Sequence, residues 1–274
     1  MEESDLISLK SFVSKIDLDS EAAYDELFKG FTQEFDMPII FIPIKKESYC
    51  LRSRNNKAGK DFEDFRDLIY PDKIYITKYS RANKPGQQVF YRSDNIETNI
   101  TELMPYWSKD MKSGETFAIT VSRWIFNEQV YVVCIPDYSN ARLMTMLENK
   151  IDLKSDPVLR EYWEYINLFF RAQGFYQPNV YKFTSAYCNA LIHNSQVIKE
   201  NVDGILYTSI QDSTGWNLAI SPKFVDKNLE LESVLKIYLR KRGHKNGKPV
   251  YDNFLNPEPI FPKKLDFESH RIIW

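Results

Sequence analysis

The order of apolar segments along the chain constrains its fold more than any other feature of the sequence. Short runs rich in β-branched and aromatic residues alternate irregularly with longer segments of helical periodicity. A regular succession of strand, helix and strand would indicate a parallel sheet, and the sequence lacks it. The sequence therefore predicts an α+β fold, a mixed β core surrounded by helices. Strands are expected at residues 38–44, 51–54, 88–92, 117–124, 129–135, 204–210, 217–220 and 234–239.

Helical periodicity marks three parts of the chain. Residues 5–34 carry two successive apolar stripes, residues 94–103 follow a predicted strand, and residues 141–195 are mainly helical. The first of these parts precedes every predicted strand. We therefore divide the chain into an N-terminal helical extension, residues 1–45, and a main domain, residues 46–274.

Two pairs of predicted strands are close enough in sequence to form hairpins. Residues 117–124 and 129–135 are separated by Phe126-Asn127-Glu128, which is typical of a tight turn. Residues 204–210 and 217–220 flank a short polar loop that contains glycine. We expect the two strands of each pair to be antiparallel neighbours.

Composition and charge exclude several classes of function. A formal net charge of -2 gives no overall attraction to nucleic acid or to an anionic membrane. No apolar stretch approaches the roughly 18–20 residues that cross a bilayer, and the acidic start of the chain does not resemble a signal peptide. Cys50, Cys134 and Cys188 are far apart, which favours neither a disulfide framework nor a zinc site. We expect a cytoplasmic protein without a membrane segment, a metal or a nucleic-acid partner.

The familiar catalytic motifs are missing from the sequence. His193, His244 and His270 stand alone, without the spacing of metal ligands. The sequence has no nucleophile elbow, phosphate-binding loop or dinucleotide fingerprint. Hydrolysis by a serine triad or by zinc is therefore disfavoured, and so is phosphoryl transfer on a phosphate-binding loop.

Two other segments place scarce polar residues at the ends of apolar runs. The first runs from Ser80-Arg81-Ala82-Asn83 to Glu102, and the second from Tyr207-Thr208-Ser209 to Asn217. A turn, a strand and a helix lie between Arg81 and Glu102, an arrangement that could bring both side chains to one site. The planar guanidinium of arginine suits phosphate oxygens, so the segments together indicate an anionic ligand.

These residues give the chain a resemblance to the RES-domain family, which is named for its Arg, Glu and Ser residues. The order and the spacing of the family pattern both agree over roughly residues 48–222. The chain departs from it at Ser80, where glycine is usual, and at Ala82, where the family often has an aromatic residue. The matching segments are Arg52-Ser53-Arg54, Ser80-Arg81-Ala82-Asn83, Gly86, Val89-Phe90-Tyr91, Thr101-Glu102, Ser209 and Asn217-Leu218.

The resemblance implies a fold like that of ADP-ribosyltransferase toxins and the cleavage of NAD, as substrate, at its nicotinamide–ribose bond. It makes residues 46–274 the NAD-binding catalytic domain and requires no metal. The implied catalytic residues are Arg81, Glu102 and Ser209, and the implied cofactor-binding residues are Arg52, Arg54, Asn83, Tyr91 and Asn217.

The chemistry of NAD explains why such a site needs no histidine. Nicotinamide leaves as a neutral ring because the bound ring is already cationic, so the barrier lies in the positive charge that develops on the ribose. On this interpretation Glu102 stabilises that charge and Arg81 binds the diphosphate, with Arg52 or Arg54 as second choice. Tyr91 packs against nicotinamide or ribose, and Ser209 fixes the orientation of the substrate.

The sequence leaves several alternatives open. Family members often act as toxins of bacterial toxin–antitoxin systems, which implies an antitoxin protein as a partner. The acceptor of ADP-ribose is water or phosphate in the leading interpretation and a protein or nucleic acid in a second one. A third is a non-catalytic RES-like interaction module. The helices of residues 5–34 pack against the main domain in our preferred interpretation, and otherwise cover the site, contact an antitoxin or form a homo-oligomer interface.

Overall fold

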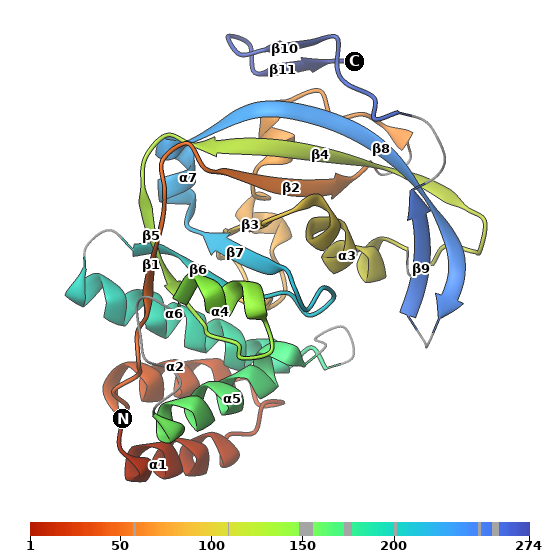
Figure 1. Ribbon diagram of the computed structural model, residues 1–274. Helices are drawn as coiled ribbons and strands as arrows, with labels where there is room; N and C mark the ends of the chain where they lie inside the picture. The colour runs from red at the N-terminus through yellow and green to blue at the C-terminus, as the bar shows by residue number, and fades with distance from the viewer. Residues whose placement is uncertain are drawn as a thin grey trace.

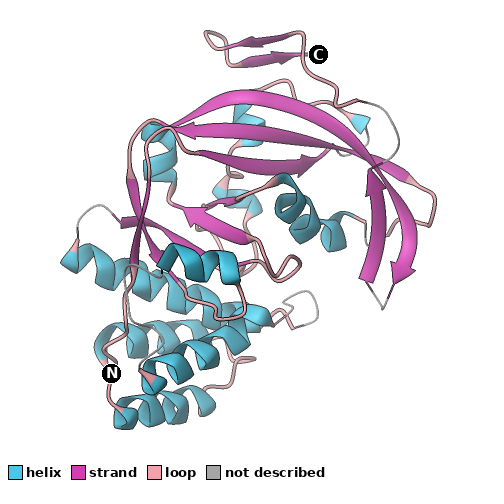
Figure 2. Ribbon diagram, viewed as in Figure 1, coloured by secondary structure: helices cyan, strands magenta, loops and turns pink. Residues whose placement is uncertain are grey.

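The computed structural model describes residues 1–56, 59–108, 110–147, 156–172, 177–199, 202–245, 248–253 and 258–274. A large curved sheet forms one part of the molecule, and most of the helices gather against one end of it (Figures 1 and 2). A small C-terminal hairpin lies at the opposite end (Figure 1). The predicted α+β fold is confirmed.

Nine strands of the described chain form the main sheet, in the order β1-β5-β6-β7-β3-β2-β4-β8-β9. The pair β5 and β6 is parallel, and the other neighbouring pairs are antiparallel, so the sheet is mixed. The strands are β1 (Phe41–Ile44), β2 (Tyr49–Asn55), β3 (Phe90–Ser93), β4 (Thr116–Phe126), β5 (Val130–Cys134), β6 (Val202–Thr208), β7 (Trp216–Ile220), β8 (Leu229–Lys245) and β9 (Lys248–Asn253), with β10 (Lys264–Asp266) and β11 (Arg271–Ile273) in the C-terminal hairpin.

One of the two predicted hairpins is confirmed and the other is wrong. Strands β6 and β7 pair directly, with Tyr207 opposite Asn217. Strands β4 and β5, although consecutive, are far apart in the sheet, because β4 pairs with β2 and β8 while β5 pairs with β1 and β6. The backbone at the predicted turn bonds to other segments instead: the Phe126 amide donates to the Ser48 carbonyl and the Asn127 amide to the Asn228 carbonyl.

The helices divide into a layer against one end of the sheet and a few single helices elsewhere (Figure 2). Helix α3 packs on β2 and β3, beside the centre of the sheet. It begins after Asn95, whose side chain accepts a hydrogen bond from the Thr98 amide and so caps the first turn. The helices are α1 (Glu3–Ser14), α2 (Ala23–Gln33), α3 (Ile96–Trp107), α4 (Ala141–Leu147), α5 (Pro157–Arg171), α6 (Val180–Ile198) and α7 (Pro222–Asn228), with short 3-10 turns at Phe65–Leu68 and Lys73–Tyr75.

The N-terminal residues are continuous with the rest of the fold. The Phe31 ring of α2 packs edge-on against Phe183 and Tyr187 of α6, with ring centroids 5.5 and 5.4 Å apart. The Lys182 ammonium donates to the carbonyls of Leu18 and Ser20 between α1 and α2. Residue 45, where the sequence places a domain boundary, follows directly on β1, an edge strand of the main sheet.

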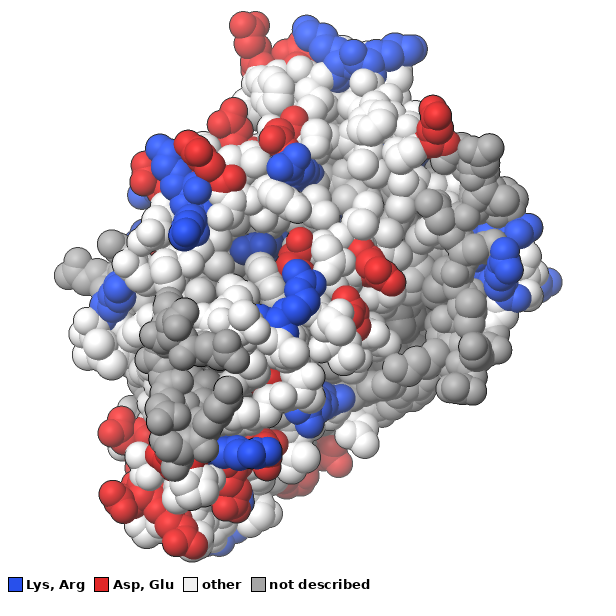
Figure 3. Space-filling model, viewed as in Figure 1, with Lys and Arg blue, Asp and Glu red and all other residues white. Residues whose placement is uncertain are grey.

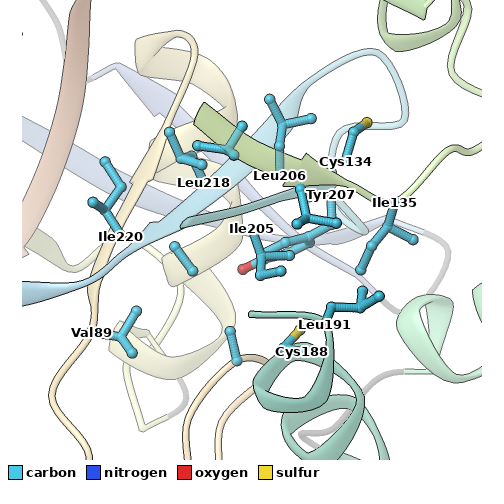
Figure 4. Close-up of a cluster of buried hydrophobic side chains, with 14 of the residues drawn as sticks. Val89, Cys134, Ile135, Cys188, Leu191, Ile205, Leu206, Tyr207, Leu218 and Ile220 are labelled. Atoms are coloured by element: carbon cyan, nitrogen blue, oxygen red, sulfur yellow. The ribbon is translucent and has the colours of Figure 1, made fainter. Parts of the chain in front are cut away.

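One part of the core lies between the sheet and α6. Alternation along β6 directs Ile205 and Tyr207 toward Cys188 and Leu191 of α6, and Leu206 to the opposite side of the sheet (Figure 4). The side chains on the α6 side fill the space below β6 and β7, so Tyr207 is buried next to the segments that carry the predicted site residues.

Candidate active site

The Glu102 carboxylate is held by a compact set of donors. Its Oε1 atom accepts hydrogen bonds from Ser209 Oγ at 2.5 Å, from the Ile210 amide at 2.9 Å and from Asn217 Nδ2 at 3.0 Å. Among the described residues no group donates to Oε2. Glu102 belongs to α3 and its donors belong to the β6–β7 hairpin, so contacts between two separate elements fix the position of this oxygen.

A further layer of hydrogen bonds orients these donors. Ser93 Oγ donates to Asn217 Oδ1 at 2.5 Å, which fixes the amide so that its Nδ2 points at Glu102. Ser209 Oγ accepts from the Asp212 amide at 3.1 Å, and the Asp212 carboxylate accepts from Thr98 Oγ1 at 2.5 Å. Hydrogen bonds to Thr98 and Thr214 lower the pKa of Asp212 despite the opposing effect of burial. The loop after Ser209 is thus tied to the first turn of α3.

Arg81 lies in the turn before β3 and is 8% exposed. Its Nη1 donates to the Phe170 carbonyl at the end of α5. The guanidinium carbon is 5.3 Å from the ring centroid of Tyr181 and 5.9 Å from that of Tyr207. Aromatic faces attract a guanidinium, so Arg81 is held mainly by rings, and Phe170 provides the one hydrogen-bond acceptor among the described residues.

Arg81 and Glu102 contact the same face of the sheet, because Tyr207, which lies beside Arg81, is directly opposite Asn217, which donates to Glu102. Burial raises the pKa of Tyr207 well above its ordinary value, and there the positive charge of Arg81 opposes the effect and the negative charge of Glu102 adds to it. The pKa of Tyr106 is also raised by burial, with the same two charges acting on it. The positive charge of Arg81 and the negative charge of Glu102 therefore both influence the hydroxyl groups of Tyr207 and Tyr106, in opposite directions.

Tyr91 and Asn83 support the turn that carries Arg81. The Tyr91 hydroxyl accepts from the Ala82 amide at 2.8 Å and donates to Asn83 Oδ1 at 2.7 Å. Asn83 Nδ2 donates in turn to the Lys84 carbonyl at 3.1 Å. The sequence predicts that both side chains bind the cofactor. In the structure, their polar atoms make hydrogen bonds within the protein. A direct contact of either with a ligand stays a prediction.

Arg52 and Arg54 lie on the other face of the sheet from Glu102. Leu51 pairs with Ser93 and Ser93 with Asn217, and residues directly opposite each other share a face. Since Asn217 reaches Glu102, Leu51 is on the Glu102 face, and alternation puts Arg52 and Arg54 on the opposite one. The Arg52 Nη1 atom donates to the Tyr91 carbonyl at 2.8 Å, and burial lowers the pKa of Arg52 to about 10. Arg54 donates to the Asp67 carbonyl.

The structure adds residues to the site that the sequence did not single out as site residues. Tyr106 and Tyr181 lie beside Arg81, and Ser93 and Asp212 lie behind the donors of Glu102. Tyr106 follows Glu102 by one helical turn, so helical periodicity could have found it. Tyr181 has no such local signal, because it reaches the site from α6.

Within the described ranges, no three His, Cys, Asp or Glu side chains gather so as to hold a metal ion. None of the helices described has both the length and the apolar character needed to cross a membrane. On the face shown in Figure 3, acidic side chains gather over α1 and α2, while Lys and Arg lie in small separate groups.

A hollow of about 580 Å³ lies where the N-terminal helices meet α5 and α6. It is lined by the connection between α1 and α2, the end of α5 and the start of α6, including Leu18, Phe169 and Asn179. Its lining contains none of the predicted site residues. The candidate site is therefore defined by the convergence of side chains around Glu102 and Arg81, rather than by this hollow.

Comparison with protein families identifies the family of this chain. The model of the RES domain matches residues 57–234, which is more than half of the chain and includes Arg81, Glu102, Ser209 and Asn217. The chain belongs to the RES-domain family. Arg52 and Arg54 precede the matched region. Comparison with curated proteins gives no match.

Proposed function

We propose that this protein cleaves NAD at the nicotinamide–ribose bond and transfers the ADP-ribose to water or phosphate. The observation that carries the proposal is the Glu102 carboxylate, which is fixed through one oxygen by Ser209, Ile210 and Asn217 near a buried guanidinium. Membership of the RES-domain family, which is consistent with an NAD-related activity, supports it.

The reaction breaks the bond between the nicotinamide nitrogen and the ribose carbon C1′. The bonding electron pair leaves with the nitrogen, which neutralises the cationic ring, and positive charge develops on the ribose. An oxygen of water or phosphate then bonds to C1′, and water gives up a proton to solvent. We assign to the ribose the Oε2 atom of Glu102, which accepts no hydrogen bond from the residues that the structure describes. A fixed carboxylate there stabilises the developing cation.

Arg81 is assigned to the diphosphate of NAD. Its charge is held by the rings of Tyr181 and Tyr207, and only Nη1 is used by an acceptor among the described residues. The remaining guanidinium donors suit two phosphate oxygens at once. Binding at Arg81 and stabilisation at Glu102 then act on different parts of the same substrate.

The proposed biological role is that of a toxin in a bacterial toxin–antitoxin system. Loss of NAD would stop growth, and an antitoxin protein that covers Arg81 and Glu102 would prevent it. Expression of the chain in a bacterial host should lower the NAD pool before growth stops. Growth arrest with an unchanged NAD pool would contradict the proposed role as an NAD-consuming toxin.

Release of nicotinamide by purified protein tests the reaction. We expect the unchanged chain to consume NAD, and Glu102→Gln to lower kcat by about 100-fold or more, as for the loss of a transition-state electrostatic contact. Glutamine keeps the shape of the side chain and an oxygen acceptor, so the melting temperature should change little. Glu97→Gln, an exposed position on the same helix, is the matched control and should keep full activity.

Two outcomes would contradict the proposal. One is that the unchanged chain releases no nicotinamide from NAD, with or without phosphate. The other is that Glu102→Gln and the unchanged chain release it at the same rate. Formation of a phosphorylated ADP-ribose identifies phosphate as acceptor, free ADP-ribose identifies water, and labelled protein or nucleic acid identifies transfer to a macromolecule.

A further inference from the structure

A contact between two tyrosines joins α3 to α6 beside the candidate site. The hydroxyl oxygens of Tyr106 and Tyr181 are 3.2 Å apart, although the residues come from separate helices. Tyr181 presents its ring to the Arg81 guanidinium, whereas Tyr106 is 49% exposed. One tyrosine of the pair is therefore packed against the site and the other is accessible from solvent.

The charges of Arg81 and Glu102 both influence the pKa of the Tyr106 hydroxyl. Burial raises its pKa, Tyr181 adds to the rise, Arg81 opposes it and Glu102 adds to it. The hydroxyl therefore stays neutral at physiological pH. Tyr106 also follows Glu102 by one helical turn, so both side chains project from the same face of α3.

The hydroxyl of Tyr91, the residue predicted from the sequence to pack against nicotinamide or ribose, makes hydrogen bonds within the protein. This hydroxyl holds Ala82 and Asn83 in the turn before β3, and Tyr207 is buried against α6. Among the four tyrosines around Arg81, namely Tyr91, Tyr106, Tyr181 and Tyr207, Tyr106 is the most exposed residue. It is the one best placed to meet a ring attached to the sugar that Glu102 faces.

We propose that Tyr106 is a specificity-determining residue that packs its ring against the cationic nicotinamide of NAD, and that Tyr181 positions it through the hydroxyl contact. The inference rests on the proposed function and deepens it. A cation is attracted to the face of a tyrosine ring, and a neutral ring of the same shape is attracted less. The attraction favours the substrate and weakens when nicotinamide leaves as a neutral molecule.

This role predicts a particular change in kinetics. The ring contact exists in the bound substrate and fades as the ring loses its charge, so it contributes to binding rather than to the chemical step. Tyr106→Ala should raise KM for NAD by between about threefold and thirtyfold, the range for a cation–ring contact. Its kcat should be unchanged or higher, because the lost contact stabilises the bound substrate more than the transition state. Tyr106→Phe keeps the ring and should restore KM to within about threefold of the unchanged chain.

Comparison of NAD with NADH isolates the charge of the ring. NADH has the same shape of dinucleotide but a neutral dihydronicotinamide, so only the contact with a cationic ring distinguishes them. Dissociation constants are measured by calorimetry in the Glu102→Gln chain, which we expect to bind NAD and to cleave it at least about 100-fold more slowly. We expect NAD to bind more tightly than NADH there, and Tyr106→Ala to reduce this preference by about threefold or more.

Tyr49→Ala provides the matched control. Tyr49 is 47% exposed, and its ring packs on the Arg123 guanidinium at 4.1 Å instead of on the site. This substitution should leave both dissociation constants unchanged. Tyr181→Phe, which removes only the hydroxyl contact, should weaken NAD binding less than Tyr106→Ala.

Failure of this inference is distinguishable from failure of the proposed function. If the unchanged chain releases nicotinamide and Tyr106→Ala keeps both KM and the NAD-to-NADH preference, the role of Tyr106 is wrong and the proposed function stands. If the unchanged chain neither binds NAD nor releases nicotinamide, the proposed function is wrong and this inference falls with it.

Discussion

The two ends of the candidate site are built in different ways. At the carboxylate end, three donors converge on one oxygen of Glu102, and Ser93 and Asp212 hold two of those donors in turn. At the arginine end, the guanidinium meets one described acceptor, the Phe170 carbonyl, and two tyrosine rings. Hydrogen bonds fix direction closely, whereas rings hold a charge and leave its donors available.

This difference predicts that the carboxylate end acts in the chemical step and the arginine end in substrate binding. A carboxylate whose position is fixed before the substrate arrives can stabilise charge in the transition state without reorganisation. A guanidinium held by rings keeps donors for the substrate. Substitutions at the carboxylate end should therefore act on kcat, and substitutions at the arginine end on KM.

The largest effect among the remaining substitutions is expected from Ser209→Ala. It removes one of the three donors to Glu102 and the acceptor of the Asp212 amide, so the carboxylate loses its fixed direction. We expect kcat for nicotinamide release to fall by about 10-fold to 100-fold, with KM nearly unchanged. Ser113→Ala, in an exposed loop, should have no effect. An increase of KM alone would contradict the assignment of Ser209 to the carboxylate end.

A smaller effect, on KM instead of on kcat, is expected from Arg81→Lys. Lysine keeps the charge but loses the planar fork that matches two phosphate oxygens. We expect KM for NAD to rise about tenfold, a cost typical of one charge-assisted hydrogen bond, while kcat changes much less. Arg160→Lys, on the exposed side of α5, is the control and should behave as the unchanged chain. A fall in kcat at constant KM would contradict the assignment of Arg81 to substrate binding.

Arg92→Met extends the comparison to a buried guanidinium that has no role in the proposed site. Arg92 is 2% exposed, lies between the rings of Phe126 and Trp216, and has no hydrogen-bond partner for its three nitrogens among the described residues. Replacement of a buried charge by an apolar side chain of similar size should raise the free energy of unfolding by about 1–4 kcal/mol. Nicotinamide release should not change.

The pH dependence of this stabilisation follows from the pKa of Arg92. Burial lowers that pKa from 12.5 to about 10, so the folded state binds the proton less tightly than the unfolded state does. The charged group therefore costs stability fully below pH 10, and the cost fades as pH rises from about 10 toward 12.5. Denaturant unfolding between pH 6 and 9 should show a constant gain for Arg92→Met. A loss of stability there would mean that Arg92 has a stabilising partner.

Local signals in the sequence predicted the parts of the site that come from neighbouring segments. The β6–β7 hairpin follows from two apolar runs and a glycine-containing loop, and it brings Ser209 close to Asn217. The helix that carries Glu102 follows from its periodicity, although it extends to Trp107. The family pattern then indicated that these residues belong together.

Other features depend on tertiary contacts that the sequence does not express. The hairpin predicted for β4 and β5 failed because both faces of β5 are largely buried, and it lies between β1 and β6 in the interior of the sheet. Alternation showed that Arg52 and Arg54 share a face, but not which face. The contact of Tyr106 with Tyr181 joins residues that are 75 positions apart, and no local pattern marks it.

The place of β2 in the sheet has a practical consequence for anyone who trims this chain. The family match starts at residue 57, yet Tyr49–Asn55 is the strand that bridges β3 and β4 in the middle of the sheet. A fragment cut to the matched boundaries would lose this bridge and the edge strand β1, and would end inside β8, leaving unpaired strand edges that invite aggregation. We therefore expect the smallest piece able to fold by itself to be longer than the segment that matches the family.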